Sequence, residues 1–422
     1  MDKALGRNTI WAFFANGAAA FFSWLMLMVL TKVAGVTEVG LFGLAQAVAL
    51  PIHTFFTFKL RIVQSTDHAA EFSDDEYRNF RILSGFLNIL FTAALAVLLY
   101  RGSTYGLILV LSLSYSVVIY REFYVSVLQK HERNDIISFS TVVQGVLGLA
   151  FFIGGYLATR DLIFGVAGIL VSRLLSVLLV DRRLARPFSS WGRVSLWESL
   201  KNGVLRPRLL NLFSVGLPMG GVALLSTLFA SIPRLVLDKS VSTEAVGFYS
   251  ALSSVVVVMS LFINSLGQSL SPRLALIYRG DKNDFRNKIK TLSLISLAFV
   301  AACLALSWFY GRELLTLLFT REYAAYHASF FKLILGGGIL VFFSIMNIAI
   351  SAQRSFRIQF PIYLACTLVI LAASLLLIPR FGLDGAVNAY ILCNITGLAL
   401  SYLVYSANMK RHRNPPVSIA AT

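Results

Sequence analysis

Charge is scarce in this sequence of 422 residues. Only 14% of them are Asp, Glu, Lys or Arg, whereas an average soluble domain carries about 25%. At the same time, 57% of the residues are hydrophobic. This combination of little charge and many hydrophobic residues excludes a soluble enzyme and a disordered chain. The three cysteines, Cys303, Cys366 and Cys393, lie in apolar runs without a Cys or His at metal-ligand spacing. They are too few for a disulfide-built domain, and we expect small apolar side chains within helices.

Recognisable catalytic motifs are also missing. The sequence contains no nucleotide-binding loop, zinc motif or nucleophile elbow. The acidic run Asp74–Glu76 is the best candidate for a metal site, but acidic residues favour helix N-termini, so we expect a solvated helix start there. The longest outer loop, about 311–327, is short for a glycan polymerase or transferase. The sequence therefore predicts no enzymatic activity, no cofactor and no metal, and it gives no sign of nucleic-acid binding.

Long apolar runs fill most of the chain. A helix needs about 20 apolar residues to cross a bilayer, and the first run is too long for the core of a signal peptide. The sequence therefore predicts an all-α polytopic membrane protein. Its twelve transmembrane helices are expected at 9–32, 40–62, 82–100, 105–127, 137–158, 162–180, 210–235, 247–270, 291–310, 328–351, 360–378 and 384–406.

Basic residues outnumber acidic ones, 37 to 20, and their placement predicts the topology. If the N-terminus is cytoplasmic, the inner segments hold 24 Lys and Arg and the outer segments hold eight. Cytoplasmic segments carry the excess of cations in membrane proteins, so both termini are expected in the cytoplasm. Five cations remain within the spans: Lys59, Arg61, Arg121, Arg173 and Lys332.

The two halves of the chain resemble each other. Thr37–Phe42 after the first span matches Thr243–Phe248 after the seventh, and Phe164–Gly168 matches Phe381–Gly385. Six spans per copy give the copies one orientation, as parallel repeats about an axis along the membrane normal. The expected organisation is a six-helix lobe at 1–185, a basic cytoplasmic linker with an amphipathic helix at 186–208, a second six-helix lobe at 209–408 and a tail at 409–422, with the lobes around a central cavity. The linker cations would contact anionic lipid head groups.

Charged residues within the spans are the candidate site residues. Inserting a cation near the midplane of the bilayer costs about 2.5–3.5 kcal/mol, so such a residue is taken as a candidate for function. Arg173 and His53 are central in their spans, while Arg121 and Glu122 lie deep in the fourth. The remaining candidates are Lys59 and Arg61 at the inner edge, which could also be simple anchors, and Arg234 near the outer end of the seventh span, either a guard or an anchor. Together they predict a positive cavity for an anionic ligand.

Two of these predictions leave alternatives open. Arg121 could pair with a carboxylate, although Glu122 is badly placed because consecutive residues diverge on a helix. His53 could equally be a packed, hydrogen-bonded histidine. If H⁺ or Na⁺ drives transport, Glu122 is the candidate coupling residue, because it is the only carboxylate well inside a span.

Three local patterns resemble a known superfamily. They are Gly35–Leu44, Leu314–Tyr323 and Ile378–Ala386, and with twelve spans in two lobes they are similar to the polysaccharide branch of the multidrug/oligosaccharidyl-lipid/polysaccharide (MOP) exporters. The resemblance implies a Wzx-type flippase of the bacterial inner membrane, a transporter for O-antigen-like glycans. It would pass an undecaprenyl-diphosphate-linked oligosaccharide to the outer leaflet by alternating access. Expected partners are this lipid-linked substrate, membrane lipids, a polysaccharide polymerase and other glycan-assembly proteins.

Other functions fit less well. An ion-coupled multidrug antiporter of the MATE type is the main alternative, but its branch often has an acidic residue in the first span, where this chain has none. The loop between spans 2 and 3 also lacks the Gly-rich Asp/Arg motif of major facilitators. A membrane scaffold would not require charge at the midplane.

Overall fold

The computed structural model describes residues 3–67, 71–189, 191–192, 194–201, 205–353, 355 and 358–411, and within them it is helical without strands. The expected tail at 409–422 lies outside these residues from position 412 on. The helices of the first half are α1 (Lys3–Val33), α2 (Val36–Phe56), α3 (Leu60–Thr66), α4 (Asp74–Leu99), α5 (Ser103–Lys130), α6 (Asn134–Thr159), α7 (Leu162–Leu175) and α8 (Arg182–Ala185). After the short linker helix α9 (Leu196–Lys201) come α10 (Leu205–Ser240), α11 (Thr243–Gly280), α12 (Lys282–Leu318), α13 (His327–Ala352) and α14 (Gln359–Arg411).

These helices confirm the predicted class, an all-α polytopic membrane protein with two six-helix lobes. Ten helical segments of the described chain are long and apolar enough to cross a membrane. α11, with 38 residues, provides another span. α14 provides two, because Gly382 (φ 55°, ψ −129°) leaves the helical region and breaks the helix where the last two predicted spans meet. Each of the twelve predicted spans falls on one of these segments.

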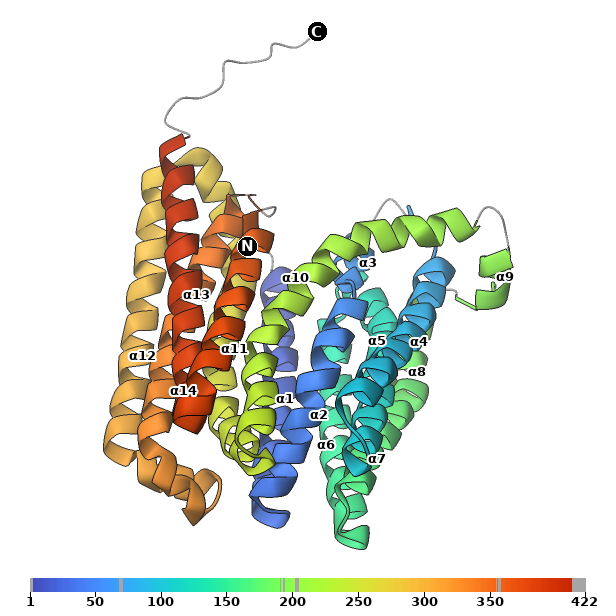
Figure 1. The fold of residues 1–422 in the computed structure, drawn as a ribbon. Helices are drawn as coiled ribbons and strands as arrows, with labels where there is room; N and C mark the ends of the chain where they lie inside the picture. Colours follow the sequence, from blue (N-terminus) through green and yellow to red (C-terminus); the bar gives the residue numbers. More distant parts are fainter. Residues whose placement is uncertain are drawn as a thin grey trace.

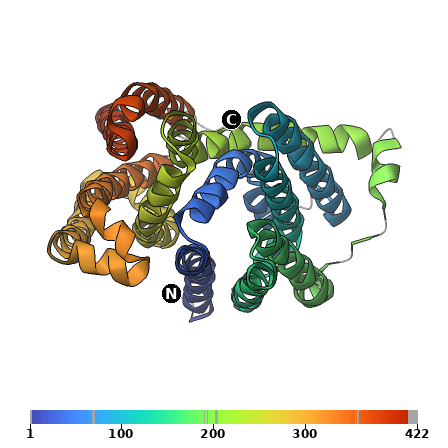
Figure 2. The same cartoon turned by 60° about the horizontal axis from the view of Figure 1, so that its bottom comes forward.

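Two groups of helices lie side by side, with α1 and α2 between them (Figures 1 and 2). In Figure 1 the start of α1 and the end of α14 point to the same end of the bundle, which we call the inner end. The chain crosses between the groups along α10, which arches over this end (Figure 1). A continuous set of buried apolar side chains, among them Val39, Val246 and Val341, joins the two lobes.

The lobes meet closely at the outer end, at the residues that the sequence repeats. A Cβ added to Gly40 of α2 would lie 2.0 Å from the carbonyl oxygen of Thr243 in α11. A Cβ added to Gly247 of α11 would lie 2.1 Å from the carbonyl oxygen of Val36 in α2. This reciprocal contact is what two parallel repeats around one axis would make. Only glycine allows the two backbones to approach so closely.

The acidic run of the sequence begins a helix, as expected. Ser73 caps α4 by accepting a hydrogen bond from the backbone N–H of Glu76, whose carboxylate accepts one from the backbone N–H of Ser73. The expectation of a solvated helix start is wrong, however, because Asp75 and Glu76 are buried. Backbone N–H groups of the linker and Arg208 cover them and satisfy their charge.

Candidate functional site

Tyr115 lies at the centre of the candidate site. Its ring on α5 stacks on the imidazole of His53 from α2, with centroids 4.6 Å apart. On the same ring lies the guanidinium of Arg173 from α7, 5.3 Å from the ring centroid. Arg173 also donates a 2.8 Å hydrogen bond to the hydroxyl of Ser114. Three helices of the first lobe thus bring two of the predicted site residues together on one aromatic ring.

Arg234 of the second lobe acts on the same tyrosine through its charge. It lies in the last part of α10, which ends at Ser240. Its guanidinium donates a 3.2 Å hydrogen bond to Ser253 on α11, and its charge acts on Tyr115 and Tyr249. Its Nε is buried without a hydrogen-bond partner. We call Tyr115, His53, Arg173 and Arg234 the central cluster.

The two arginines of the central cluster have no carboxylate partner in the described part of the chain. Neither Arg173 nor Arg234 forms an ion pair there, and their side-chain hydrogen bonds go to serine hydroxyls. Two desolvated guanidinium groups without a carboxylate are costly in a membrane protein. Such an arrangement favours an anion that arrives from outside the protein, because phosphate and carboxylate are the groups that guanidinium binds best.

Arg121 lies apart from this cluster, in an internal ion pair. Its Nε is 3.0 Å from Asp181, whose side chain is fully buried. Ser140 and Thr141 of α6 accept further hydrogen bonds from the same guanidinium. Asp181 is the last residue of a π-helical turn at Ser176–Asp181, directly after α7. A carboxylate partner for Arg121 was one of the two alternatives that the sequence left open, and as argued there it is not Glu122.

Glu122 pairs instead with Arg81, which is not among the site residues predicted from the sequence. The guanidinium of Arg81 is completely buried, 3.3 Å from Glu122 and 3.3 Å from the carbonyl oxygen of Thr57. Its Nε and one terminal nitrogen have no partner. The signal that could have found Arg81 is the buried polar stripe of α4, in which Arg81, Ser84 and Asn88 recur at helical spacing.

The inner-edge cations have different surroundings. Arg61 donates a 2.7 Å hydrogen bond to the side-chain oxygen of Gln129, and its charge acts on Glu122. We call Arg61, Arg81 and Glu122 the inner network. Lys59 lies at the break between α2 and α3 with φ 51°, and its side chain is exposed. Lys332, the fifth cation within the spans, pairs with Asp384 at 3.4 Å.

Comparison with known proteins identifies relatives over nearly the whole chain. The family model described as polysaccharide biosynthesis protein matches residues 5–278. A capsular polysaccharide biosynthesis protein, CapF of Staphylococcus aureus, is 26% identical over 94% of this chain and 98% of its own length.

Solved structures with a similar fold are membrane transporters. The lipid II flippase MurJ, in an inward closed conformation, aligns with a TM-score of 0.71 at 13% identity, over 96% of this chain and 89% of its own. A MATE transporter of Vibrio cholerae aligns with a TM-score of 0.64 at 15% identity, over 97% of both chains. A MOP-superfamily transporter of Pyrococcus furiosus, described as having a binding pocket of reverse polarity, gives a TM-score of 0.64 at 14% identity, over 98% of this chain and 96% of its own.

Proposed function

The chain belongs to the polysaccharide biosynthesis protein family, and from this premise we propose that it is a flippase for an anionic, lipid-linked oligosaccharide. The substrate would be an undecaprenyl-diphosphate-linked repeat unit, carried from the cytoplasmic to the outer leaflet of the bacterial inner membrane. In this proposal the protein moves its substrate without covalent chemistry. Polysaccharide polymerase and other assembly proteins would use the translocated product.

One observation carries this proposal: two buried guanidinium groups from opposite lobes, one on the ring of Tyr115 and one whose charge acts on the same tyrosine, have no carboxylate partner in the described residues. Arg173 and Arg234 together supply the charge that a diphosphate needs, and a bidentate contact to phosphate suits each of them. A cationic drug would be repelled by the same charges. The central cluster therefore favours an anionic cargo over the cations that a multidrug antiporter exports.

The position of the central cluster between the lobes would also serve alternating access. Arg173 belongs to the first lobe and Arg234 to the second, so a diphosphate bound to both would hold the lobes together. Rocking one lobe against the other would then change which side of the membrane reaches the site. Lys59 and Arg61, at the inner edge of the first lobe, would attract the head group to the inner opening. Arg121 would add to the positive potential of the first lobe while it remains in its ion pair with Asp181.

Ion coupling, if present, would use the inner network. Protonation of Glu122 would leave the buried charge of Arg81 without its partner, so proton uptake would change the packing of α4 against α5. Alternatively, Na⁺ would bind to the carboxylate of Glu122 in place of the guanidinium of Arg81. Either event would connect an ion to the inner end of the first lobe, next to the proposed entrance.

The proposal assigns a topology and a domain organisation. Both termini would lie in the cytoplasm, as the excess of Lys and Arg on inner segments predicts. The lobes would be 1–185 and 209–408, joined by the cytoplasmic linker 186–208 and followed by the tail 409–422. Reporter fusions at the linker and at the C-terminus would test this orientation, and an outward-facing linker would refute it.

Complementation of a deletion strain tests the function. The chain should restore glycan display at the cell surface and should leave susceptibility to cationic drugs unchanged. Arg173→Ala should abolish display at unchanged protein levels, because it removes a diphosphate contact. Arg121→Ala should also reduce display, but through the loss of its ion pair with Asp181 and hence of stability. Normal display in Arg173→Ala would refute the site assignment. Restored drug resistance without glycan display would favour the antiporter instead.

A further inference from the structure

A second cationic site lies on the inner side of the central cluster, at the inner end of the first lobe. There the start of α4, the end of α5 and α8 surround a cavity of about 560 Å³, which the linker closes on one side. The residues of its lining that bear on its chemistry are Arg78, Arg182, Arg186, Tyr120, Tyr124 and Trp191. The proposed transport function uses none of them.

The cavity is basic, and much of its charge is not neutralised. Arg182 and Arg186 are exposed and form no ion pair in the described part of the chain. Arg78 forms an ion pair with Asp75 at 3.4 Å and donates a 2.7 Å hydrogen bond to the carbonyl oxygen of Val194. Its Nε is nevertheless buried without a hydrogen-bond partner. Three guanidinium groups line one cavity, and among the described residues one carboxylate pairs with them, which favours an anionic ligand.

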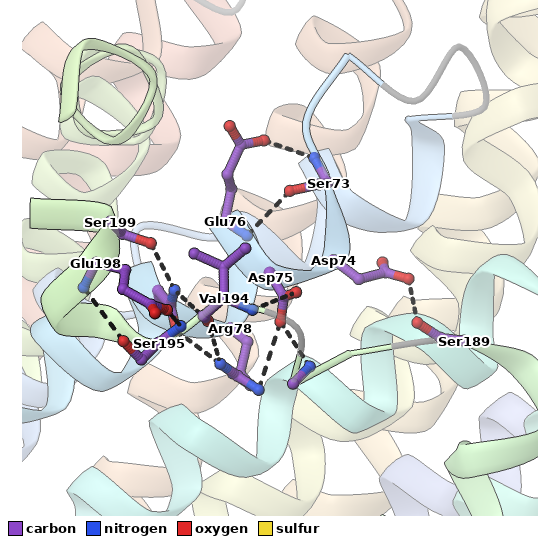
Figure 3. A network of polar contacts seen from close by, with 12 residues as sticks. Ser73, Asp74, Asp75, Glu76, Arg78, Ser189, Val194, Ser195, Glu198 and Ser199 are labelled. Carbon is purple, nitrogen blue, oxygen red and sulfur yellow. Dashed lines mark hydrogen bonds and ion pairs between the residues drawn. The ribbon is translucent and has the colours of Figure 1, made fainter. Parts of the chain in front are cut away.

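The linker holds one wall of this cavity in place. Asp75 accepts hydrogen bonds from the backbone N–H groups of Gly192 (2.7 Å) and Val194 (3.2 Å), and Asp74 accepts one from Ser189. Figure 3 shows Asp74 and Asp75 directed from the start of α4 toward these linker residues. The linker therefore reaches the cavity through contacts that do not involve Arg182 or Arg186.

Aromatic side chains complete the lining. Trp191 packs edge-on against Phe123 and Tyr124, with ring centroids 5.6 Å and 5.3 Å apart. The hydroxyls of Tyr120 and Tyr124 are 2.9 Å apart and share one hydrogen bond. Trp and Tyr are the residues that gather at the head-group level of a membrane. A cavity with these aromatic residues and three Arg at the end of the spans lies where lipid phosphates lie.

We propose that this cavity binds the phosphate head group of an anionic membrane lipid, with a two-phosphate lipid of the cardiolipin type as the best fit. Basic pockets between transmembrane helices on the cytoplasmic side bind such head groups. The phosphates would lie on Arg182 and Arg186, beside the guanidinium of Arg78. The acyl chains would extend into the bilayer along the outside of the first lobe. A bound lipid would then fasten the linker between the lobes to the first lobe.

The test uses the full-length protein in detergent and measures its Tm during titration. Cardiolipin should raise the Tm, whereas phosphatidylcholine, which has no net charge, should not. The double variant Arg182→Ala/Arg186→Ala should need about 30-fold more cardiolipin for half of the maximal shift. Arg183→Ala is the matched control, since Arg183 is exposed and adjacent but does not line the cavity, and it should respond as the wild type does. Native mass spectrometry should show retained cardiolipin in the wild type and in the control.

Three results would overturn the proposal. If sodium pyrophosphate raised the Tm as much as cardiolipin does at equal phosphate concentration, the cavity would be assigned to a soluble phosphate ligand. An equal shift with phosphatidylcholine would show that the charge of the head group does not matter. An equal loss in Arg183→Ala would show a general charge effect rather than a site. Because binding is measured directly, each result is independent of whether the protein transports an oligosaccharide.

Discussion

Removing the charge of Arg121 should destabilise the protein, whereas removing that of Arg173 should leave its stability nearly unchanged, although both residues lie within the spans. Arg121→Ala would leave the fully buried Asp181 without a counter-ion. Arg173→Gln would remove a guanidinium that has no carboxylate partner. The two variants therefore separate an arginine that holds the protein together from one that is available to a ligand.

The contacts of each residue set the magnitudes. Breaking a buried ion pair by removing one partner costs about 3–5 kcal/mol, so Arg121→Ala should be destabilised by that amount. For Arg173→Gln, the loss of the hydrogen bond to Ser114 costs about 1.5–3 kcal/mol and the loss of the contact to Tyr115 about 0.5–2 kcal/mol. Removing a midplane charge returns about 2.5–3.5 kcal/mol. The net change for Arg173→Gln is therefore close to zero.

Thermal unfolding in detergent measures both effects. At this chain length Arg121→Ala should lower the Tm by about 3–6 °C, and Arg173→Gln should leave it within about 1 °C. The second change Asp181→Ala, added to Arg121→Ala, should recover most of the loss because it removes the stranded charge. A large decrease in Tm for Arg173→Gln, or none for Arg121→Ala, would refute the assignment of the two arginines.

Three further predictions concern other parts of the molecule. Glu122→Gln should lower the Tm by leaving the buried Arg81 unpaired, and if Glu122 couples transport to protons it should also remove the pH dependence of transport; an unchanged Tm would contradict the pairing. Gly40→Ala should weaken the outer contact between the lobes, so that cysteines introduced at this contact react faster with a membrane-impermeant thiol reagent. Gly17→Ala, where the added methyl group enters open space, should not change this labelling, and equal labelling in the two variants would contradict the contact. Burial raises the pKa of Asp67, but hydrogen bonds from the loop and from a tyrosine hydroxyl outweigh it and lower that pKa overall, so its contribution is present at neutral pH and lost as the pH falls through the lowered value. The difference in Tm between wild type and Asp67→Asn should therefore vanish in acid, and a difference that persists there would contradict these hydrogen bonds.

The fold could be predicted from the sequence to a large extent, because apolar length and cation placement follow directly from membrane physics. The ends of the helices could be predicted less closely than the spans themselves. α11 and α12 extend well beyond their apolar runs, since polar residues such as Lys282 and Lys290 continue a helix outside the hydrocarbon region. The repeated Gly40 and Gly247 gave the relation between the lobes, but only the structure brings them into reciprocal contact.

The candidate site could be predicted only in part. Depth within a span selected Arg173 and His53, and the structure brings both to Tyr115. Depth could not distinguish them from Arg121, because its partner Asp181 is 60 residues away in the sequence, at the end of a π-helical turn. Pairing across helices depends on packing, which one sequence does not reveal.

Transport in proteoliposomes tests the central claim most directly. Purified protein would be reconstituted with an undecaprenyl-diphosphate-linked oligosaccharide, and an added impermeant glycosidase would report how fast the oligosaccharide moves between the leaflets. Two charge-assisted contacts are removed in Arg173→Gln/Arg234→Gln, so this variant should flip the lipid about 100-fold more slowly or worse, at nearly unchanged Tm. Arg183→Ala should flip it at the wild-type rate. Flipping at the wild-type rate by the double variant would contradict the proposal that the central cluster binds the diphosphate.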